Sequence, residues 1–367
     1  MKTIYIVKNI HNKDVDTDVL DIINKNDGSF YIFNNKELEK KIKLWNKYFR
    51  FIIPHYAIKS NPYIPLINTL AKNNFSFDCA STHEINVIKD QNICNDRIIY
   101  ANPIKTNEEV EILKQMKEKP LTVFDNVSQL KKMEKYDIDI SYLIRLFVNT
   151  TDASCPFDDK YGAQPGDIKE ILNYKSKNKL SFKGFSFHVG SGNKNIDSYL
   201  NAMKKVEEGI QIATEYGETT EIINIGGGLD YKNPNLNELS KLYYKYSLKY
   251  KIFAEPGRFF SEASFILKVV IVEKKIIDDW ILYYIDDSTY HSFSCMIYDH
   301  LDYQKGNKGK KSKVYGKTCD GTDVIFSEIY LPELEVDDIL VFPNMGAYTM
   351  CSASDFNGFL VPKVIDL

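Results

Sequence analysis

Residues 51–61, FIIPHYAIKSN, decide the fold that we expect for this 367-residue chain. The stretch opens with an apolar run typical of a β-strand, and a helical pattern begins near Pro62. Lys59 therefore lies at the carboxyl end of a strand, just before a helix. In parallel α/β proteins this end faces the ligand crevice, where a desolvated lysine can capture a carbonyl as a Schiff base. The alternative is a solvated surface lysine.

Strand-like runs alternate with helical patterns from Ser29 to Ala254. The predicted strands are 51–58, 75–79, 97–101, 121–124, 142–148, 183–188, 221–226 and 251–255. Eight such repeats in this length predict an α/β fold with a (β/α)₈ TIM-like barrel, whose usual size is about 250 residues. An open doubly wound sheet is the alternative.

The pattern changes after Glu255, where the strand-like runs are no longer separated by helices. These runs are 264–274, 280–286, 321–330 and 338–342. They predict a C-terminal all-β sandwich or barrel, completed by the N-terminal run at 4–7, whereas the basic stretch 305–313 is expected to be a solvated loop. The expected domains are therefore 29–260 for the barrel, and 1–28 plus 261–367 for the β domain.

The bulk composition excludes several classes of protein. A net charge of −3 with a pI near 6.1 argues against a nucleic-acid or acidic-membrane partner. The N-terminus is broken by charges too early for a signal peptide, and no apolar run approaches the length of a membrane span. The six cysteines are scattered singly, which fits neither a disulfide framework nor a zinc site, so we expect no bound metal and a cytoplasmic location.

Polar residues gather at the carboxyl ends of the predicted barrel strands, which meet at one mouth of a closed barrel. They are Lys59, Asp78, Glu84, Arg145, His188, Gly226–Gly227–Gly228, Glu255, Gly257 and Arg258. The glycines and Arg258 could hold a phosphate, although a glycine run is also a common turn and such an arginine also a common loop ion pair. His188 could equally be a core histidine.

Glu255 is expected to be buried, and a buried carboxylate needs a cationic partner. A phosphate site, a carbonyl-capturing lysine and a buried carboxylate are together what pyridoxal 5′-phosphate (PLP) requires. The lysine holds the aldehyde, the glycines hold the phosphate, and the carboxylate keeps the ring nitrogen protonated.

Seven motifs then follow one another along the chain: PHYAIKSN, FDCAS, FHVGSGN, INIGGGL, AEPGRFF, TCDGTD and NMGAYT. In this order they resemble the fold-type III, alanine-racemase-like PLP-dependent decarboxylases of basic amino acids, and among these the ornithine decarboxylases. The resemblance runs from residue 54 to about 359 and implies a PLP-binding barrel followed by a β domain, as the strand pattern predicts.

The resemblance also implies roles for the residues that match these motifs. Lys59 would bind the PLP aldehyde, Glu255 would pair with the ring nitrogen, and His188 would stack on the ring. The phosphate would be held by Ser191, Gly226, Gly227, Gly228, Gly257, Arg258 and Tyr348. Asp78, Glu84 and Arg145 would line the cofactor pocket.

The family's active site is shared between the subunits of a homodimer, and the resemblance implies the same here. The TCDGTD loop would come from the partner, with Cys319 guiding protonation and Asp320 receiving the distal ammonium of the substrate. A small buried hydrophobe is the alternative role for Cys319. Lys160 and Asp323 match a pair that bridges the dimer interface, and Phe356 matches a residue near the substrate loop.

The resemblance also implies that Asp299, together with Asp320 of the partner, reads the substrate, within a stretch that also contributes Tyr290 and Tyr298. Two carboxylates around one ammonium suit ornithine, which would lose its α-carboxylate as carbon dioxide and leave as putrescine, a step in polyamine biosynthesis. Lysine, arginine and diaminopimelate are the alternative substrates, although Cys319-Asp320-Gly321 differs from the CES of diaminopimelate decarboxylases. A catalytically inactive homologue that acts as a binding regulator is the alternative of another class.

Overall fold

The computed structural model describes residues 2–7, 16–149, 153, 160–174, 180–298 and 309–367, which form two compact units. One unit spans Ile42–Phe259, and the other combines Met1–Lys41 with Phe260–Leu367. The domain boundary expected at residue 29 differs from this division. Residues 29–41 belong to the second unit, because strand β2 (Phe30–Phe33) hydrogen bonds to strands of that unit.

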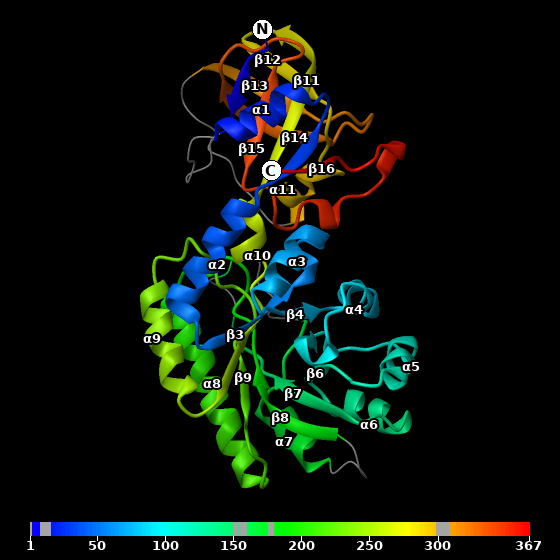
Figure 1. The fold of residues 1–367 in the computed structure, drawn as a ribbon, viewed down its shortest axis with the longest axis vertical. Coiled ribbons are helices and arrows are strands. Elements are labelled where there is room, and N and C mark those ends of the chain that lie inside the picture. The colour runs from blue at the N-terminus through cyan, green and yellow to red at the C-terminus, as the bar shows by residue number, and fades with distance from the viewer. Residues whose placement is uncertain (1, 8–15, 150–152, 154–159, 175–179, 299–308) are drawn as a thin grey trace. The chain divides into compact units, whose positions relative to one another are not determined.

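The unit Ile42–Phe259 contains a closed barrel of eight parallel strands (Figure 1). The strands, in chain order, are β3 (Ile52–Ala57), β4 (Ser76–Cys79), β5 (Ile98–Tyr100), β6 (Leu121–Phe124), β7 (Ile140–Arg145), β8 (Leu180–Ser186), β9 (Ile222–Asn224) and β10 (Lys251–Ala254). The last strand pairs with the first, with Ile252 opposite Ile52. This closure confirms the predicted barrel and excludes the open sheet.

Helices follow the barrel strands and cover the outside of the barrel. They are α3 (Ile64–Lys72), α4 (Thr82–Lys89), α5 (Asn107–Gln115), α6 (Val127–Lys135), α7 (Pro165–Asn173), α8 (Ile196–Glu215) and α9 (Leu236–Ser247), with short helices η1 (Ile58–Ser60), η2 (Asn95–Arg97) and α10 (Arg258–Ser261). In Figure 1, α4, α5 and α6 lie on one side of the strands and α8 and α9 on the other.

Local sequence signals set where these helices begin. Thr106 caps α5 in a capping box, in which its hydroxyl accepts from the backbone of Glu109 while the Glu109 carboxylate accepts from the backbone of Thr106. Ser81 caps α4 through a single bond, in which its hydroxyl accepts from the backbone N–H of Glu84. These caps end each loop at a fixed residue, so that the loops at the barrel mouth are short and well defined.

The second unit contains a mixed sheet. Its strands are β1 (Ile4–Ile6), β2, β11 (Phe265–Ile277), β12 (Trp280–Ile285), β13 (Lys310–Tyr315), β14 (Val324–Leu331), β15 (Ile339–Pro343) and β16 (Lys363–Asp366). The order is β1-β15-β11-β12-β13-β14, with β2 paired to both β11 and β16. The N-terminal strand completes this sheet by pairing in parallel with β15, as predicted. The remaining helices are α1 (Thr17–Lys25), α2 (Asn35–Phe49), η3 (Glu262–Ser264), η4 (Ser292–Ser294), α11 (Cys295–Tyr298), η5 (Met350–Ser352) and η6 (Phe356–Gly358).

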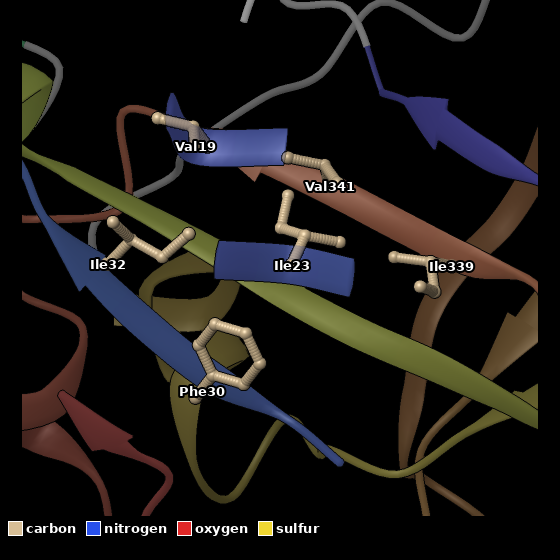
Figure 2. Close-up of a cluster of buried hydrophobic side chains, with 6 residues drawn as sticks. All are labelled: Val19, Ile23, Phe30, Ile32, Ile339 and Val341. Atoms are coloured by element: carbon tan, nitrogen blue, oxygen red, sulfur yellow. The ribbon is translucent and has the colours of Figure 1, made fainter. Parts of the chain in front are cut away.

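One face of this sheet is covered by α1. Figure 2 shows the apolar side chains of the helix pointing toward those of β2 and β15, and all of them are buried. The members of the cluster are Val19, Ile23, Phe30, Ile32, Ile339 and Val341. Because these residues come from both ends of the chain, their burial joins the N-terminal segment to the C-terminal one.

The prediction of a loop at 305–313 is wrong from residue 310 onward, while 305–308 lie outside the described residues. Residues 310–315 form β13, which lies between β12 and β14. Ser312 and Val314 are buried and alternate with exposed or half-buried lysines. This alternation of buried and exposed side chains is typical of a strand, but the many lysines made the segment resemble a solvated loop. Separately, none of the helices in the described ranges has the length and apolar character needed to cross a membrane.

Candidate active site

Lys59 lies in η1, directly after β3, and its amine faces the neighbouring strand. Its Nζ donates a hydrogen bond to Oδ2 of Asp78 over 3.4 Å. The parallel pairing of β3 with β4 places Ala57 opposite Asp78 and so brings the two side chains together. Asp78 is only 1 % exposed, and its other oxygen, Oδ1, has no hydrogen-bond partner in the described part of the chain. A buried acceptor thus remains available at the barrel mouth.

Glu84 lies in the first turn of α4, beside Asp78. Its carboxylate accepts a 2.6 Å hydrogen bond from the backbone N–H of Ala80. Burial raises the pKa of Glu84, and the negative charge of Asp78 raises it further, while Lys59 opposes both effects. Two carboxyl groups and one amine therefore lie together at this corner of the barrel, where Asp78 is buried and the Lys59 side chain is 45 % exposed.

Glu255 follows β10, and its carboxylate is fixed by an amide that the sequence analysis did not single out. Asn224, the last residue of β9, donates from Nδ2 to Oε1 of Glu255 over 2.6 Å, and its own Oδ1 accepts from the backbone N–H of Gly226. Burial and then the charge of Asp78 raise the pKa of Glu255 to about 7. Within the described residues, Glu255 forms no ion pair, so its ionised form lacks the partner that a buried carboxylate needs.

The glycines after β9 are required by the backbone. Gly226 and Gly228 have φ of +65° and +95°, in the left-handed region, and a Cβ on Gly226 would lie 2.0 Å from the carbonyl oxygen of Phe187. A Cβ on Gly227 would lie 2.6 Å from Nε2 of His188. Only glycine fits at these positions, so the backbone approaches the loop after β8 closely and its N–H groups form a turn of the kind that binds phosphate.

Gly257 and Arg258 occupy the next loop, after β10. A Cβ on Gly257 would lie 2.7 Å from the Cβ of Ser60, so this glycine permits close contact between the loops after β10 and β3. Arg258 is the first residue of α10. The PGR segment is thus next in space to the residue that follows Lys59.

His188 and Arg145 lie at the ends of β8 and β7. The backbone N–H of Gly190 donates to Nδ1 of His188 over 2.9 Å, so that this nitrogen is the acceptor in a neutral ring. Burial, with Arg145 and Lys59 adding positive charge, lowers the pKa of His188 well below its ordinary value. Arg145 lies over the ring of Tyr161, with 5.0 Å between its Cζ and the ring centre.

The residues of this mouth fit PLP. They provide a primary amine, a glycine turn, an arginine and a neutral imidazole, together with the half-buried carboxylate of Glu255, which forms no ion pair among the described residues. The free Oδ1 of Asp78 offers one more buried acceptor. A group with an aldehyde, a phosphate and a basic ring nitrogen satisfies each of these features.

Three of the predicted substrate residues and the predicted proton donor, Cys319, form a second cluster, in the unit that contains the mixed sheet. The hydroxyl of Tyr290 donates to Oδ2 of Asp320, and the ring of Phe356 stacks on that of Tyr290 with 4.1 Å between centroids. The Tyr290 hydrogen bond, aided by donors from Thr322, lowers the pKa of Asp320, so this carboxylate stays ionised. Cys319 is exposed and contacts Asn357, as described below.

Asp323 is buried and accepts five hydrogen bonds within its own unit. The donors are Ser288 Oγ, Thr289 N, Thr289 Oγ1, Thr318 N and Thr318 Oγ1. These donors fill the roughly four lone-pair positions of a carboxylate. Lys160 is exposed, with its Nζ over the ring of Tyr161. The pairing of Lys160 with Asp323 across a dimer therefore stays a prediction.

The remaining predicted residues are placed as follows. Ser191 lies in the loop after β8, partly exposed, and Tyr298 ends α11. Tyr348 follows β15 in the unit of the mixed sheet, with a left-handed φ of 56°, and its phosphate contact stays a prediction. Asp299 lies outside the described residues. Asn224 was missed, although a polar residue inside the apolar run INIGGGL was a signal for a buried functional contact.

Comparison with known proteins gives consistent results. Residues 35–262 match the family model described as pyridoxal-dependent decarboxylase, pyridoxal binding domain. Ornithine decarboxylase of Caenorhabditis elegans is 32 % identical over 370 residues, which cover 93 % of this chain and 87 % of the relative. The chloroplastic ornithine decarboxylase of Nicotiana glauca is 32 % identical over 361 residues, which cover 92 % of this chain and 83 % of the relative. The solved structure of the Paramecium bursaria Chlorella virus arginine decarboxylase bound to agmatine is 31 % identical, with a TM-score of 0.88, and the match covers 95 % of this chain and 100 % of that one.

Proposed function

Because the chain belongs to the pyridoxal-dependent decarboxylase family, we propose that it converts L-ornithine to putrescine and carbon dioxide. The observation that carries the chemistry is Glu255, a half-buried carboxylate with a pKa of about 7 and no ion pair among the described residues, at the same barrel mouth as Lys59. The observation that carries the substrate is Asp320, an ionised carboxylate oriented by Tyr290.

The cofactor, PLP, supplies an electron sink for the bond that breaks when the α-carboxylate leaves. The motifs assign the residues that would hold it, and the geometry of the barrel mouth supports that assignment. Lys59 would bind its aldehyde, Gly226–Gly228 and Arg258 would hold its phosphate, and Glu255 would pair with its ring nitrogen. His188 would lie against the ring.

The chain's own residues control charge and protons during the reaction. The hydrogen bond from Asn224 fixes the Glu255 carboxylate, and the ring nitrogen that pairs with it is thereby kept protonated. Asp78 holds the Lys59 amine while it is not bound to the cofactor. Cys319 gives a proton to the substrate carbon, and Asp320 with Asp299 binds the distal ammonium of ornithine.

The test is release of carbon dioxide from ornithine, lysine, arginine and diaminopimelate by the purified chain with PLP, with each amine identified by mass. We expect putrescine from ornithine as the main product. Arginine is the second candidate, since an arginine decarboxylase is among the similar structures. Agmatine as the main product would mean that arginine is the substrate, and cadaverine would mean that lysine is; either result would overturn the assignment of ornithine. Bound PLP without any product would support an inactive regulator instead.

We further propose that the chain is a homodimer with shared active sites, in which Cys319, Asp320 and Phe356 act on the partner's barrel and Lys160 and Asp323 lie at the interface. Mixing an inactive Lys59→Ala chain with an inactive Asp320→Ala chain tests this. Random pairing gives heterodimers with one intact site, so about one quarter of the unaltered activity should return. No recovery, with mixed dimers demonstrated by mass, would contradict shared sites.

A cytoplasmic location is the last part of the proposal. It rests on Cys79, Cys94, Cys295, Cys319 and Cys351, none of which forms a disulfide within the described residues, as in proteins of a reducing compartment. Cell fractionation with an antibody to the chain tests it, and recovery with an organelle would overturn it.

A further inference from the structure

Three segments of the unit with the mixed sheet are hydrogen bonded to one another around the second cluster. They are residues 287–292, 316–323 and 354–359. The first is joined to the second by the three bonds that Asp323 accepts from Ser288 and Thr289. It is joined to the third by the backbone N–H of Ser354, which donates to the carbonyl of Tyr290 over 2.9 Å. The arrangement of the third segment is therefore coupled to the loop that carries Cys319.

Asn357 holds Cys319 directly. Its Oδ1 accepts from the backbone N–H of Cys319 at 3.3 Å and from the thiol Sγ at 3.5 Å. One amide oxygen thus fixes both the main chain and the side chain of the cysteine. The neighbouring residue, Phe356, stacks on Tyr290, whose hydroxyl binds Asp320. Two adjacent residues of one segment therefore hold two adjacent residues of another.

The backbone makes Asn357 suited to this task. It has φ 58° and ψ 13°, a left-handed conformation that asparagine adopts more readily than most residues, and Gly358 follows with φ 75°. Further along, the carbonyl of Phe359 accepts from Nε2 of His291, a buried ring, at 3.2 Å. The amide is thus presented by a tight turn that is tied down on both sides.

We propose that Asn357 is a positioning residue for the Cys319 thiol. Together, Phe356 and Asn357 hold the proton donor, Cys319, and the substrate-reading carboxylate, Asp320, in fixed positions relative to each other. The roles of Cys319 and Asp320 in this inference rest on the proposed function, whereas the contact between Asn357 and Cys319 does not depend on it. Asn357 acts through Cys319 and touches no reacting atom.

The proton transfer shows what this position controls. The S–H bond breaks, a C–H bond forms at the substrate carbon that lost carbon dioxide, and the resulting thiolate is reprotonated by water. A proton delivered instead to the cofactor carbon leaves the substrate nitrogen on the cofactor, and water then supplies the oxygen of an aldehyde product. Carbon dioxide is released in both cases, but putrescine is formed only in the first.

The first test needs neither substrate nor cofactor. Asn357→Gly removes the amide and keeps a residue that tolerates positive φ, and Asp278→Gly, at φ 54° in the turn after β11, is the matched control. Alkylation of each cysteine by iodoacetamide is followed by peptide mass spectrometry. Loss of one weak hydrogen bond predicts about three- to tenfold faster alkylation of Cys319 in Asn357→Gly. Cys351 and the Asp278→Gly protein should be unchanged.

The second test uses the PLP-loaded enzyme. Asn357→Gly should lower the ratio of putrescine to carbon dioxide, while KM for ornithine stays within about twofold because Asp320 keeps its bond to Tyr290. Asn357→Asp keeps an acceptor oxygen and should restore the product ratio, although its charge disfavours the thiolate and slows alkylation. Unchanged Cys319 alkylation in Asn357→Gly would overturn the inference, and so would equal acceleration at Cys351, which would indicate general loosening. Failure to decarboxylate ornithine at all would refute the proposed function and leave the alkylation result standing.

Discussion

Replacing Glu255 by glutamine is expected to stabilise the cofactor-free protein and to inactivate the loaded enzyme. Burial raises the pKa of Glu255 from 4.5 to about 7, which disfavours its ionised form by about 3 kcal/mol, at about 1.4 kcal/mol for each tenfold change in the acid constant. Glutamine has nearly the same shape, never ionises, and can still accept the hydrogen bond from Asn224.

The sign of the pH dependence follows from the raised pKa. Below about pH 4.5 Glu255 is neutral in both the folded and the unfolded chain, so the substitution changes little. Between pH 4.5 and 7 the unfolded chain ionises Glu255 while the folded chain keeps it protonated, so the cost to stability grows with pH and levels off once the folded chain ionises above about pH 7. Glutamine avoids that cost. The gain should therefore appear between pH 4.5 and 7 and reach its full value, about 3 kcal/mol, near pH 8.

Thermal melting of the cofactor-stripped protein at pH 5 and pH 8 measures this. A gain of that size corresponds to roughly 6–12 °C in Tm at pH 8 for a domain of this length, and much less at pH 5. Glu111→Gln, at an exposed position in the middle of α5, is the matched control and should change Tm little at either pH. With PLP bound, Glu255→Gln should lose about 10²-fold or more in kcat, because it removes the partner of the ring nitrogen. Equal Tm values for Glu255→Gln and the unaltered protein at pH 8 would refute the reasoning.

Three further predictions concern other residues. Gly227→Ala should displace the ring of His188, since the added Cβ would lie 2.6 Å from Nε2. An absorbance titration should then show PLP binding weakened by about tenfold or more. Gly166→Ala, with open space around the added Cβ, should leave PLP binding unchanged. Tyr290→Phe should raise KM for ornithine about three- to tenfold in steady-state kinetics, because the substrate-reading carboxylate loses its orienting bond. Burial lowers the pKa of Lys105, so above that pKa the folded chain has lost this proton while the unfolded chain still holds it. The stability of the protein to urea should therefore rise as the pH rises toward 10, and this rise should be absent in Lys105→Met. The same pH slope in both proteins would contradict the burial of a cation at this position.

The barrel could be predicted from the sequence because its parallel strands are buried on both faces. Runs such as Ile98–Ile99 and Ile222–Ile223 are short, apolar, β-branched and buried, and each is followed by a polar residue and a helical pattern. Every predicted barrel strand overlaps an observed one. The side chains that they place at the mouth follow from the same pattern, since parallel strands align their carboxyl ends.

Other features depend on contacts that no local pattern records. Strand β2 (Phe30–Phe33) is fully buried and reads like a barrel strand, yet its partners are β11 and β16, which come more than 200 residues later. The lysines of β13 suggested a loop, because sequence composition gives no sign that Lys311 covers the ring of Trp280. Asn357 could not be assigned a role from FNGF alone, because the residue that it holds lies in another segment.

The central claim is that Lys59 holds the cofactor at the mouth of this barrel. The most direct test is reduction of the PLP-loaded protein with sodium borohydride, which converts a Schiff base to a stable secondary amine, followed by digestion and mass analysis of the labelled peptide. We predict a single labelled lysine, Lys59, in the segment HYAIKSN. A label on another lysine, or none on a protein that retains bound PLP, would contradict the account.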